Sequence, residues 1–257
     1  MKRLKQKAAN LDLIQFTDPH LFADRRGEMR GVNTYDSLLK VLAAAQQQHW
    51  PPDALLVTGD IAQDESRGGY RIFRSVFDPL SMPVLCIPGN HDDPGFMRDE
   101  LSGDYILMEP VAFDHWAVLL LNTYVHGTAS GELHQAALEG LDARLTARTR
   151  EHYLICLHHQ PVPVGSRWLD GVGLRNSEAF FEILDRHDNV RGVLWGHVHQ
   201  QFDGERKGVQ LMGSPSTCRQ FMPRSSDFAL DDRPPGYRWL SLGEDGSIRT
   251  GVEYVGD

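Results

Sequence analysis

Residues 84–92, Val-Leu-Cys-Ile-Pro-Gly-Asn-His-Asp, place three polar side chains directly behind a short apolar run. The run at 84–87 has the composition of a buried strand, and Pro88 ends it. A turn with three consecutive polar functional groups costs stability unless the groups have a role. Asn90 and His91 are therefore candidates for a functional site at the end of this strand.

Four other polar motifs follow apolar runs in the same way. Asp-Pro-His or Gly-Asp alone is weak evidence for a site, because both are common in turns. The two histidines of Gly-His-Val-His are stronger evidence, because alternate residues of an extended segment would face one centre. All the motifs occur in order at predicted strand ends, which favours one shared site over unrelated turns. The four motifs are Asp18-Pro19-His20, Gly59-Asp60, His158-His159 and Gly196-His197-Val198-His199.

The segments between the motifs predict how they are brought together. Helical periodicity covers 33–49, with Asn33 or Thr34 as the N-cap, and a second helix ends near Phe77. Strands and helices that alternate in this way predict a parallel sheet, whose carboxyl ends meet at one edge. Convergence there is what a site for two metal ions requires. Across the chain, further strands are predicted at 11–17, 54–58, 116–123, 153–157, 190–195, 209–212 and 237–242, and further helices at 134–147 and 178–187.

Composition predicts one compact domain over residues 1–257, with a basic, polar segment at 1–10 that frays. No apolar stretch has the length of a membrane span, so we expect no membrane association. The net charge of −9 argues against broad electrostatic binding of nucleic acid. Three cysteines without paired spacing predict thiols in a reducing compartment, hence a cytoplasmic protein. The sequence gives no indication of oligomeric state.

The ordered set DxH, GD, GNHD, H and GHxH resembles the calcineurin-like metallophosphoesterase superfamily. Within it, the chain is similar to the bacterial class III 3',5'-cyclic AMP phosphodiesterases over about residues 11–250. That closer similarity rests on further segments: 17–22 (TDPHLF), 31–34 (GVNT), 58–64 (TGDIAQD), 157–161 (LHHQP), 168–170 (WLD), 174–176 (LRN), 215–218 (PSTC) and 235–238 (PGYR).

The resemblance implies a four-layer αββα sandwich with two metal ions about 3.5–4 Å apart at the carboxyl edge. It places Asp18, His20 and His199 on the first metal. It places Asn90, His158 and His197 on the second metal, with Asp60 bridging the two. Carboxylate, amide and imidazole donors suit Mn²⁺, Fe²⁺/Fe³⁺ or Zn²⁺ better than Ca²⁺, which prefers oxygen ligands.

The implied reaction is hydrolysis of 3',5'-cyclic AMP to 5'-AMP by in-line attack of a metal-bridging hydroxide. His91 is our candidate for contacting the phosphate and protonating the leaving oxygen, with Asn90 beside it. The alternative is a related metallophosphodiesterase for a glycerophosphodiester, a nucleotide sugar or a broad range of diesters. A binding scaffold of the same fold is disfavoured, because such a scaffold is expected to have lost ligands and none is missing here.

Some details stay open at this level. His158 is favoured over His159 as the ligand, and His159 is expected to point elsewhere, near the rim. Many relatives carry an acidic residue at the position of Gln63, where it orients the catalytic histidine, so Asp64 or Asp92 could take that role here. Residues 213–218 and 220–235 are expected to form part of the substrate pocket, with Trp168, Arg219 and Phe221 at the nucleoside end.

Overall fold

The computed structural model describes residues 1–147 and 152–256 and contains two large β-sheets. One sheet has the strand order β17-β16-β2-β5-β6-β7 and the other the order β1-β8-β9-β10-β11-β13-β12. The strands of the first sheet are β2 (Leu11–Phe16), β5 (Ala54–Thr58), β6 (Val84–Ile87), β7 (Ile106–Leu107), β16 (Gly236–Leu242) and β17 (Ile248–Tyr254). Those of the second are β1 (Lys2–Arg3), β8 (Val111–Ala112), β9 (Trp116–Leu120), β10 (His152–Leu157), β11 (Val190–Trp195), β12 (Phe202–Arg206) and β13 (Val209–Gly213).

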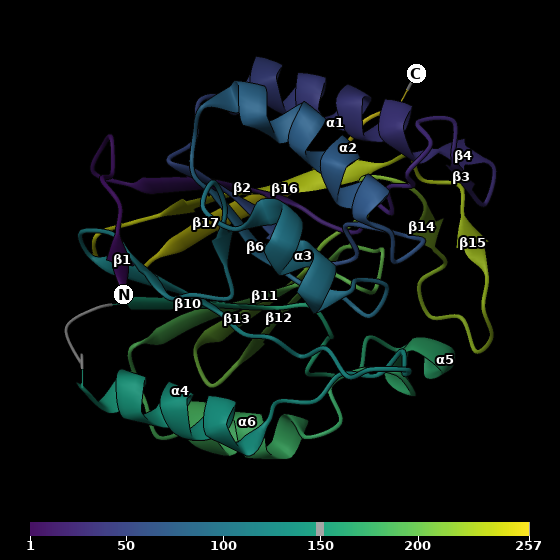
Figure 1. The fold of residues 1–257 in the computed structure, drawn as a ribbon. Helices are drawn as coiled ribbons and strands as arrows, with labels where there is room; N and C mark the ends of the chain where they lie inside the picture. Colours follow the sequence, from purple (N-terminus) through teal and green to yellow (C-terminus); the bar gives the residue numbers. More distant parts are fainter. Residues whose placement is uncertain (148–151, 257) are drawn as a thin grey trace.

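Helices cover the outer face of each sheet, as Figure 1 shows. Helices α1 (Thr34–Gln48), α2 (Arg67–Phe77) and α3 (Pro94–Leu101) lie on the six-stranded sheet, and η1 (Asp78–Leu80) follows α2. Helices α4 (Gln135–Ala147) and α6 (Ser177–Leu184) lie on the seven-stranded sheet. The two sheets pack face to face through a third apolar cluster, so the predicted four-layer αββα sandwich is confirmed.

The strands in the middle of each sheet are buried on both faces, and their sequences reflect this. In β2, Ile14 and Phe16 pack under the helices, whereas Leu11 and Leu13 pack between the sheets. Both sets are apolar because both faces of a covered parallel sheet are buried. β2, β5 and β6 run parallel, as do β9, β10, β11 and β13, so their carboxyl ends share one edge of each sheet.

Three smaller elements stand near that edge, on the right of Figure 1. They are a hairpin of β3 and β4, the short helix α5, and a hairpin of β14 and β15. Their bounds are β3 (Glu28–Met29), β4 (Val32–Asn33), α5 (Arg167–Asp170), β14 (Gln220–Phe221) and β15 (Leu230–Asp231).

Most predicted elements are confirmed, with changes at their ends. Asn33 is the N-cap of α1, where its side chain accepts a hydrogen bond from the Asp36 amide. The strand predicted at 116–123 ends at Leu120, and the helix predicted at 178–187 covers Ser177–Leu184. Among the described residues, no helix has both the length and the apolar composition needed to cross a bilayer.

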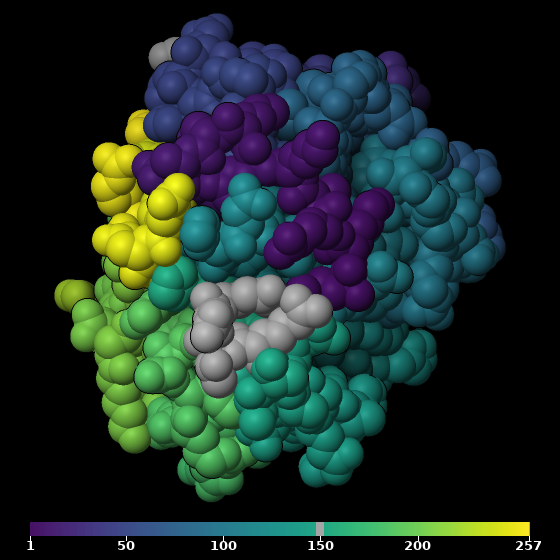
Figure 2. All heavy atoms as spheres, turned by 90° about the vertical axis from the view of Figure 1, so that its left-hand side faces the viewer, coloured from purple at the N-terminus to yellow at the C-terminus, as the bar shows by residue number. Residues whose placement is uncertain are grey.

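The expectation that residues 1–10 fray is wrong for part of this segment. Lys2 and Arg3 pair in parallel with Val111 and Ala112, and the Lys7 amide donates to the Asp53 carboxylate at 2.8 Å. Figure 2 shows this N-terminal segment, in purple, lying across one face of the molecule. A free edge strand at β8 supplies backbone partners that composition alone does not indicate.

Candidate metal centre and active site

The first group of candidate ligands contains Asp18, His20, Asp60 and His199. Asp18 and His20 follow β2, Asp60 follows β5, and His199 lies after β11. All four are buried, and one ligand atom from each lies within 4.8 Å of the others. The Nε2 atoms of His20 and His199 are 3.1 Å apart, and Asp18 Oδ1 is 3.3 Å from Nε2 of His199. Side chains from three loops thus converge on one point.

The second group contains His158, His159 and His197, which are also buried and have ligand atoms within 4.8 Å of one another. His158 Nε2 lies 3.2 Å from Oδ1 of Asn90. The expectation that His159 points elsewhere, near the rim, is wrong. Its ring centroid is 4.8 Å from that of His158 and 4.7 Å from that of His197, and its side chain is fully buried.

Asp60 contacts both groups. Its Oδ2 atom lies 3.7 Å from Nε2 of His20 and 3.5 Å from Nε2 of His158. Its Oδ1 atom accepts a hydrogen bond from the His91 amide at 2.8 Å. Oδ2 of Asp60 therefore lies between an imidazole of the first group and an imidazole of the second.

The backbone at these loops is left-handed at five candidate ligands, a conformation that costs about 1–3 kcal/mol at a non-glycine residue. This corrects the expected geometry of the Gly-His-Val-His motif. Its two histidines are not on an extended segment; they sit at sharp turns and face different groups. The φ angles are 52° at Asp18, 48° at His20, 49° at Asp60, 64° at His197 and 45° at His199.

Glycine precedes a candidate ligand in three of the motifs for a steric reason. A Cβ atom at Gly89 would lie 2.2 Å from Oδ1 of Asp60. One at Gly196 would lie 2.1 Å from Oγ1 of Thr17. The ligand loops therefore pack backbone against side chain, which only glycine permits.

Hydrogen bonds from the far side of two imidazole rings set their orientation. His158 donates from Nδ1 to the Thr58 carbonyl, and His199 donates from Nδ1 to the Arg219 carbonyl, each at 2.7 Å. Because a carbonyl only accepts, Nδ1 carries the proton in both rings. The Nε2 atoms thus face the candidate metal positions, as in other histidine metal sites.

Burial and the Asp60 carboxylate control protonation. Burial lowers the pKa of His20 and of His197 to about 3, which keeps both rings neutral and able to bind a metal. Burial also acts to lower the pKa of His158, but Asp60 outweighs it and raises that pKa to about 9. Burial by itself would raise the pKa of Asp60, but the nearby His158 has the larger opposite effect. The pKa of Asp60 is therefore well below its usual value.

The residues present fit the binding of metal ions. They offer carboxylates, an amide oxygen and several imidazoles, a mixed set that suits Mn²⁺, iron or Zn²⁺. Nε2 of His197 is buried and has no hydrogen-bond partner among the described residues. A buried polar atom without a partner is costly, and a metal ion would satisfy it.

His91 stands beside the first group, half-buried, with its ring centroid 5.2 Å from that of His20. Nε2 of Gln63 lies 3.3 Å from Nδ1 of His91. Asp64 instead accepts from the Ala23 and Ser66 amides. Of the residues considered for orienting His91, the structure brings Gln63 to it and neither Asp64 nor Asp92.

Asp92 has a different task that the sequence did not reveal. Its buried carboxylate accepts hydrogen bonds from the Gly89, Ile61 and Ala62 amides and from the Tyr70 hydroxyl. It thereby ties the loop after β5 to the loop after β6. Burial together with Asp60 raises the pKa of Asp92 to about 6.

An aromatic cluster lies next to His199. Phe221 stacks on the His199 ring with centroids 4.0 Å apart and an angle of 10° between planes. Trp168 and Phe228 pack on Phe221 with centroids 5.1 and 5.5 Å away. The Arg30 guanidinium lies 5.0 Å from the centre of the Phe228 ring. The sequence had singled out Trp168 and Phe221 by name, and Phe228 lies in the segment 220–235 that was predicted to line the pocket, whereas Arg30 was not predicted.

Residues 213–218 return to the metal edge as expected, but they support it from behind. Ser216 donates from Oγ to the Asp18 carbonyl at 2.7 Å, and the Thr217 amide donates to the Thr17 carbonyl at 3.0 Å. Ser216 and Thr217 are fully buried, so they hold the Asp18 loop and do not line an open pocket.

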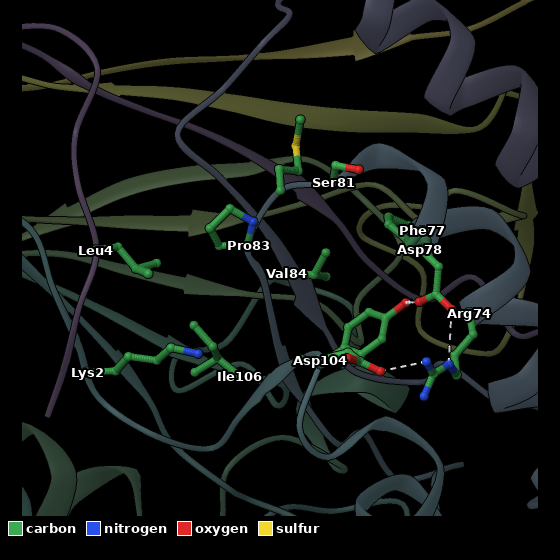
Figure 3. A pocket seen from close by; sticks show the side chains of 12 residues that line it. Lys2, Leu4, Arg74, Phe77, Asp78, Ser81, Pro83, Val84, Asp104 and Ile106 are labelled. Atoms are coloured by element: carbon green, nitrogen blue, oxygen red, sulfur yellow. Dashed lines mark hydrogen bonds and ion pairs between the residues drawn. The ribbon is translucent and has the colours of Figure 1, made fainter.

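A cleft of about 520 Å³ lies elsewhere, at the amino end of β6 (Figure 3). None of the candidate ligands lines it. Arg74, which reaches into it, is paired with Asp78 and Asp104 at 3.1 and 2.6 Å, as the dashed lines in Figure 3 show. The positive charge of Arg74 is therefore neutralised by two carboxylates of the protein. The residues that line this cleft do not suggest a second active site.

Comparison with known proteins agrees with this geometry. The family model for calcineurin-like phosphoesterases matches residues 11–201. The chain belongs to that family. Members of the family are metallophosphoesterases, and the protein is accordingly a phosphoester hydrolase. Its candidate ligand groups lie within the matched residues.

Similar proteins are bacterial 3',5'-cyclic adenosine monophosphate phosphodiesterases. That of Pseudomonas aeruginosa is 40% identical over 97% of this chain and 92% of its own length. That of Vibrio vulnificus is 41% identical over 95% and 90%. Among solved structures, a dimetal phosphatase from Danio rerio has a TM-score of 0.66 at 17% identity, covering 96% of this chain and 99% of its own. At that identity the likeness supports the fold.

Proposed function

We propose that this protein is a dinuclear-metal phosphodiesterase that hydrolyses 3',5'-cyclic AMP to 5'-AMP. The observation that carries the proposal is Asp60, whose carboxylate lies between two buried ligand groups and accepts a hydrogen bond from the amide of His91. The substrate follows from the similarity to cyclic AMP phosphodiesterases of 40% identity over nearly the whole chain.

Asp18, His20 and His199 would hold the first metal, Asn90, His158 and His197 would hold the second, and Asp60 would bridge the two. Two bound ions would activate a water molecule and neutralise charge on the phosphoryl oxygens. The mixed oxygen and nitrogen donors favour Fe²⁺/Fe³⁺, Mn²⁺ or Zn²⁺.

His91 and Asn90 would act on the phosphate. Both are half-buried, so they form the part of the site that a substrate can reach, in contrast to the buried ligands behind them. His91 would hold a proton at its Nε2 atom and donate it to the ribose 3'-oxygen as that oxygen leaves. Its backbone amide is fixed to Asp60, which keeps the ring beside the metal centre.

The nucleoside would lie against the aromatic cluster. Phe221 and Trp168 present ring faces and edges next to His199, and base rings stack on such side chains. The backbone carbonyl of Arg219 orients His199. The side chain of Arg219 would face the nucleoside. These residues lie on α5 and the β14–β15 hairpin, outside the metal-binding loops.

We also propose that residues 1–257 form a single domain and that the protein is cytoplasmic. β16 and β17 complete the sheet that begins with β2, which joins the two ends of the chain in one core. Three buried free thiols, Cys86, Cys156 and Cys218, are typical of a reducing compartment.

A product assay tests the activity. Purified protein with Mn²⁺ should convert cyclic AMP to 5'-AMP, lose this activity with a chelator and regain it when Mn²⁺ is restored. Cyclic GMP and glycerophosphodiesters serve as competing substrates. A clear preference for a glycerophosphodiester, or formation of 3'-AMP, would contradict the proposed substrate or reaction.

Metal analysis tests the centre separately. The parent protein should carry two transition-metal ions per chain, and Asp60→Ala should carry one or none and lose activity. Asp64→Ala is the matched control, because Asp64 is a nearby, exposed carboxylate that binds backbone amides. Two ions and parental activity in Asp60→Ala would refute the shared carboxylate.

A further inference from the structure

The layer between the two sheets is apolar over most of its area but becomes polar next to the candidate ligands. Strand alternation explains where this change occurs. Positions that face the other sheet carry apolar side chains away from the site and polar side chains near it. Five such polar side chains have at most 1% exposure: Gln15, Thr17, Thr58, Ser214 and Arg238.

These five side chains form one continuous series of hydrogen bonds, which we call the polar chain. Arg238 donates from Nε to Oγ of Ser214 at 3.1 Å, and Ser214 donates to Oε1 of Gln15. Gln15 donates from Nε2 to Oγ1 of Thr58 at 2.7 Å. Thr58 in turn donates to Oγ1 of Thr17 at 2.7 Å.

The polar chain ends on a candidate metal ligand. Thr17 donates from Oγ1 to Oδ2 of Asp18 at 2.6 Å. A guanidinium cannot accept and an ionised carboxylate cannot donate, so the direction of every bond between Arg238 and Asp18 is determined. The chain therefore runs from a buried cation to a buried anion, and each bond polarises the next.

Arg238 is anchored at the outer end. It lies 2.9 Å from Oδ1 of Asp203, whose side chain is 48% exposed. It also donates to the Gly213 carbonyl at 2.9 Å and to Oγ1 of Thr250 at 3.2 Å. Burial lowers the pKa of Arg238 and Asp203 opposes this effect. The guanidinium is thus a fixed, charged start of the polar chain.

At the inner end, the two oxygens of Asp18 have different environments. Oδ2 is the acceptor for Thr17, whereas Oδ1 lies 3.3 Å from Nε2 of His199, on the side of the candidate metal. The His197 amide donates to both oxygens at 3.1 Å. Fixing Oδ2 in this way leaves Oδ1 directed at the metal position.

We propose that Arg238 is a positioning residue for the first metal site and acts on Asp18 through the polar chain. This rests on the proposed metal centre. Partners behind a ligand typically change metal affinity about 10–100-fold when removed. The effect is carried by a buried path, where hydrogen bonds are strong and water does not screen them.

Mn²⁺ binding to chelator-treated protein tests the proposal without using substrate. Free Mn²⁺ is followed by electron paramagnetic resonance during titration. Thr58→Val keeps the shape of the side chain and removes the hydroxyl, so it should weaken one of the two Mn²⁺ sites about 10-fold. Thr58→Ser keeps the hydroxyl and should bind Mn²⁺ as the parent does.

A double-mutant cycle tests whether Arg238 acts through that path. Arg238→Met should weaken the same Mn²⁺ site about 10-fold. The double variant Arg238→Met/Thr58→Val should bind Mn²⁺ no more weakly than either single variant, because both substitutions interrupt the same polar chain. Leu240→Ala is the control for lost packing, because Leu240 lies on the same strand between the sheets, and it should keep parental Mn²⁺ affinity.

Five results would overturn the proposal: parental affinity in Arg238→Met, parental affinity in Thr58→Val, equal losses in Thr58→Val and Thr58→Ser, multiplying losses in the double variant, or the same loss in Leu240→Ala. Should Arg238→Met fail to fold by circular dichroism, Ser214→Ala takes its place in the cycle, because Ser214 accepts the hydrogen bond from Arg238 and its loss disconnects Arg238 from the polar chain. A parent protein that binds no Mn²⁺ would instead contradict the proposed metal centre.

Discussion

Nε2 of Gln63 lies 3.3 Å from Nδ1 of His91, so the side chain beside this imidazole is a neutral amide and not a carboxylate. A neutral amide can fix the plane of an imidazole through a hydrogen bond without adding a charge beside it. Gln63 follows β5, whereas His91 follows β6, so the contact joins neighbouring loops of the site. Gln63 is therefore the side chain that holds the proposed proton donor in place.

We expect Gln63→Leu to retain both metal ions and to lower kcat for cyclic AMP about 10-fold, because His91 would lose its orienting partner. Gln63→Glu keeps a polar partner that accepts a hydrogen bond from the imidazole and should recover part of the rate. The cycle with His91→Ala provides the check by steady-state kinetics. If Gln63→Leu still slowed the His91→Ala enzyme about 10-fold, Gln63 would act by another route.

The sequence was sufficient to predict that the candidate ligands lie close together, because each follows a strand with an apolar signature. Asp18, Asp60, Asn90, His158 and His197 are brought together by parallel strands whose ends must share an edge. The N-cap at Asn33 was also predictable, because it depends only on residues next to it in the sequence. Patterns of period two and of about 3.6 residues carry this information without knowledge of the packing.

Contacts between loops were not predictable, since they depend on backbone turns that no periodicity encodes. The left-handed residues at His197 and His199 replaced an expected extended segment. His159 was placed near the rim but is buried beside His197. Asp92, considered as a partner for His91, instead accepts hydrogen bonds from backbone amides of two loops. Each of these outcomes is decided by tertiary packing.

Metal binding should release a proton below pH 9. In the metal-free protein, Asp60 raises the pKa of His158 to about 9, so the ring is protonated at pH 7 and must lose its proton to bind a metal. Affinity should therefore rise about 10-fold per pH unit from pH 7 towards 9 and level off above it. His20 and His197, with pKa values lowered to about 3 by burial, should not contribute.

Calorimetric titration with Mn²⁺ in buffers of different ionisation enthalpy measures this release directly. About one proton per chain is expected at pH 7.5. His158→Ala removes the titrating group and should flatten the pH dependence. An affinity that does not change between pH 7 and 9 in the parent would contradict the role of His158.

Phe228 should bind the base without affecting chemistry. Its side chain is 45% exposed and packs on Trp168 and Phe221 with centroids 5.3 and 5.5 Å away. A lost stacking partner costs about 1–3 kcal/mol, so Phe228→Ala should raise KM for cyclic AMP about 10-fold and leave kcat near the parental value. Phe221 is a poorer probe, because it also stacks on His199 and its removal should lower kcat as well.

Met222→Ala is the matched control for this comparison. Like Phe228, Met222 lies between β14 and β15, and it is 40% exposed. It takes no part in the aromatic contacts described above. Its KM for cyclic AMP should stay at the parental value. Equal KM values for Phe228→Ala and the parent would show that the base lies elsewhere.

The kinetic signature of His91 should differ from that of a metal ligand. A ribose 3'-oxygen leaves as a strongly basic alkoxide and needs a proton, whereas a nitrophenolate does not. General acid catalysis contributes about 10²–10⁴-fold, so His91→Ala should lose activity of that order towards cyclic AMP and much less towards an aryl phosphodiester. Metal content should remain parental, because His91 reaches the ligand groups through its backbone amide.

His199→Ala supplies the contrast, since His199 lies in the first ligand group with Asp18 and His20. Loss of a metal ligand weakens charge stabilisation for every leaving group, so both substrates should be affected alike. Metal analysis should show less than the parental content. Equal losses on both substrates for His91→Ala, with metals intact, would instead assign His91 to holding the phosphate, because binding the phosphate serves both substrates equally.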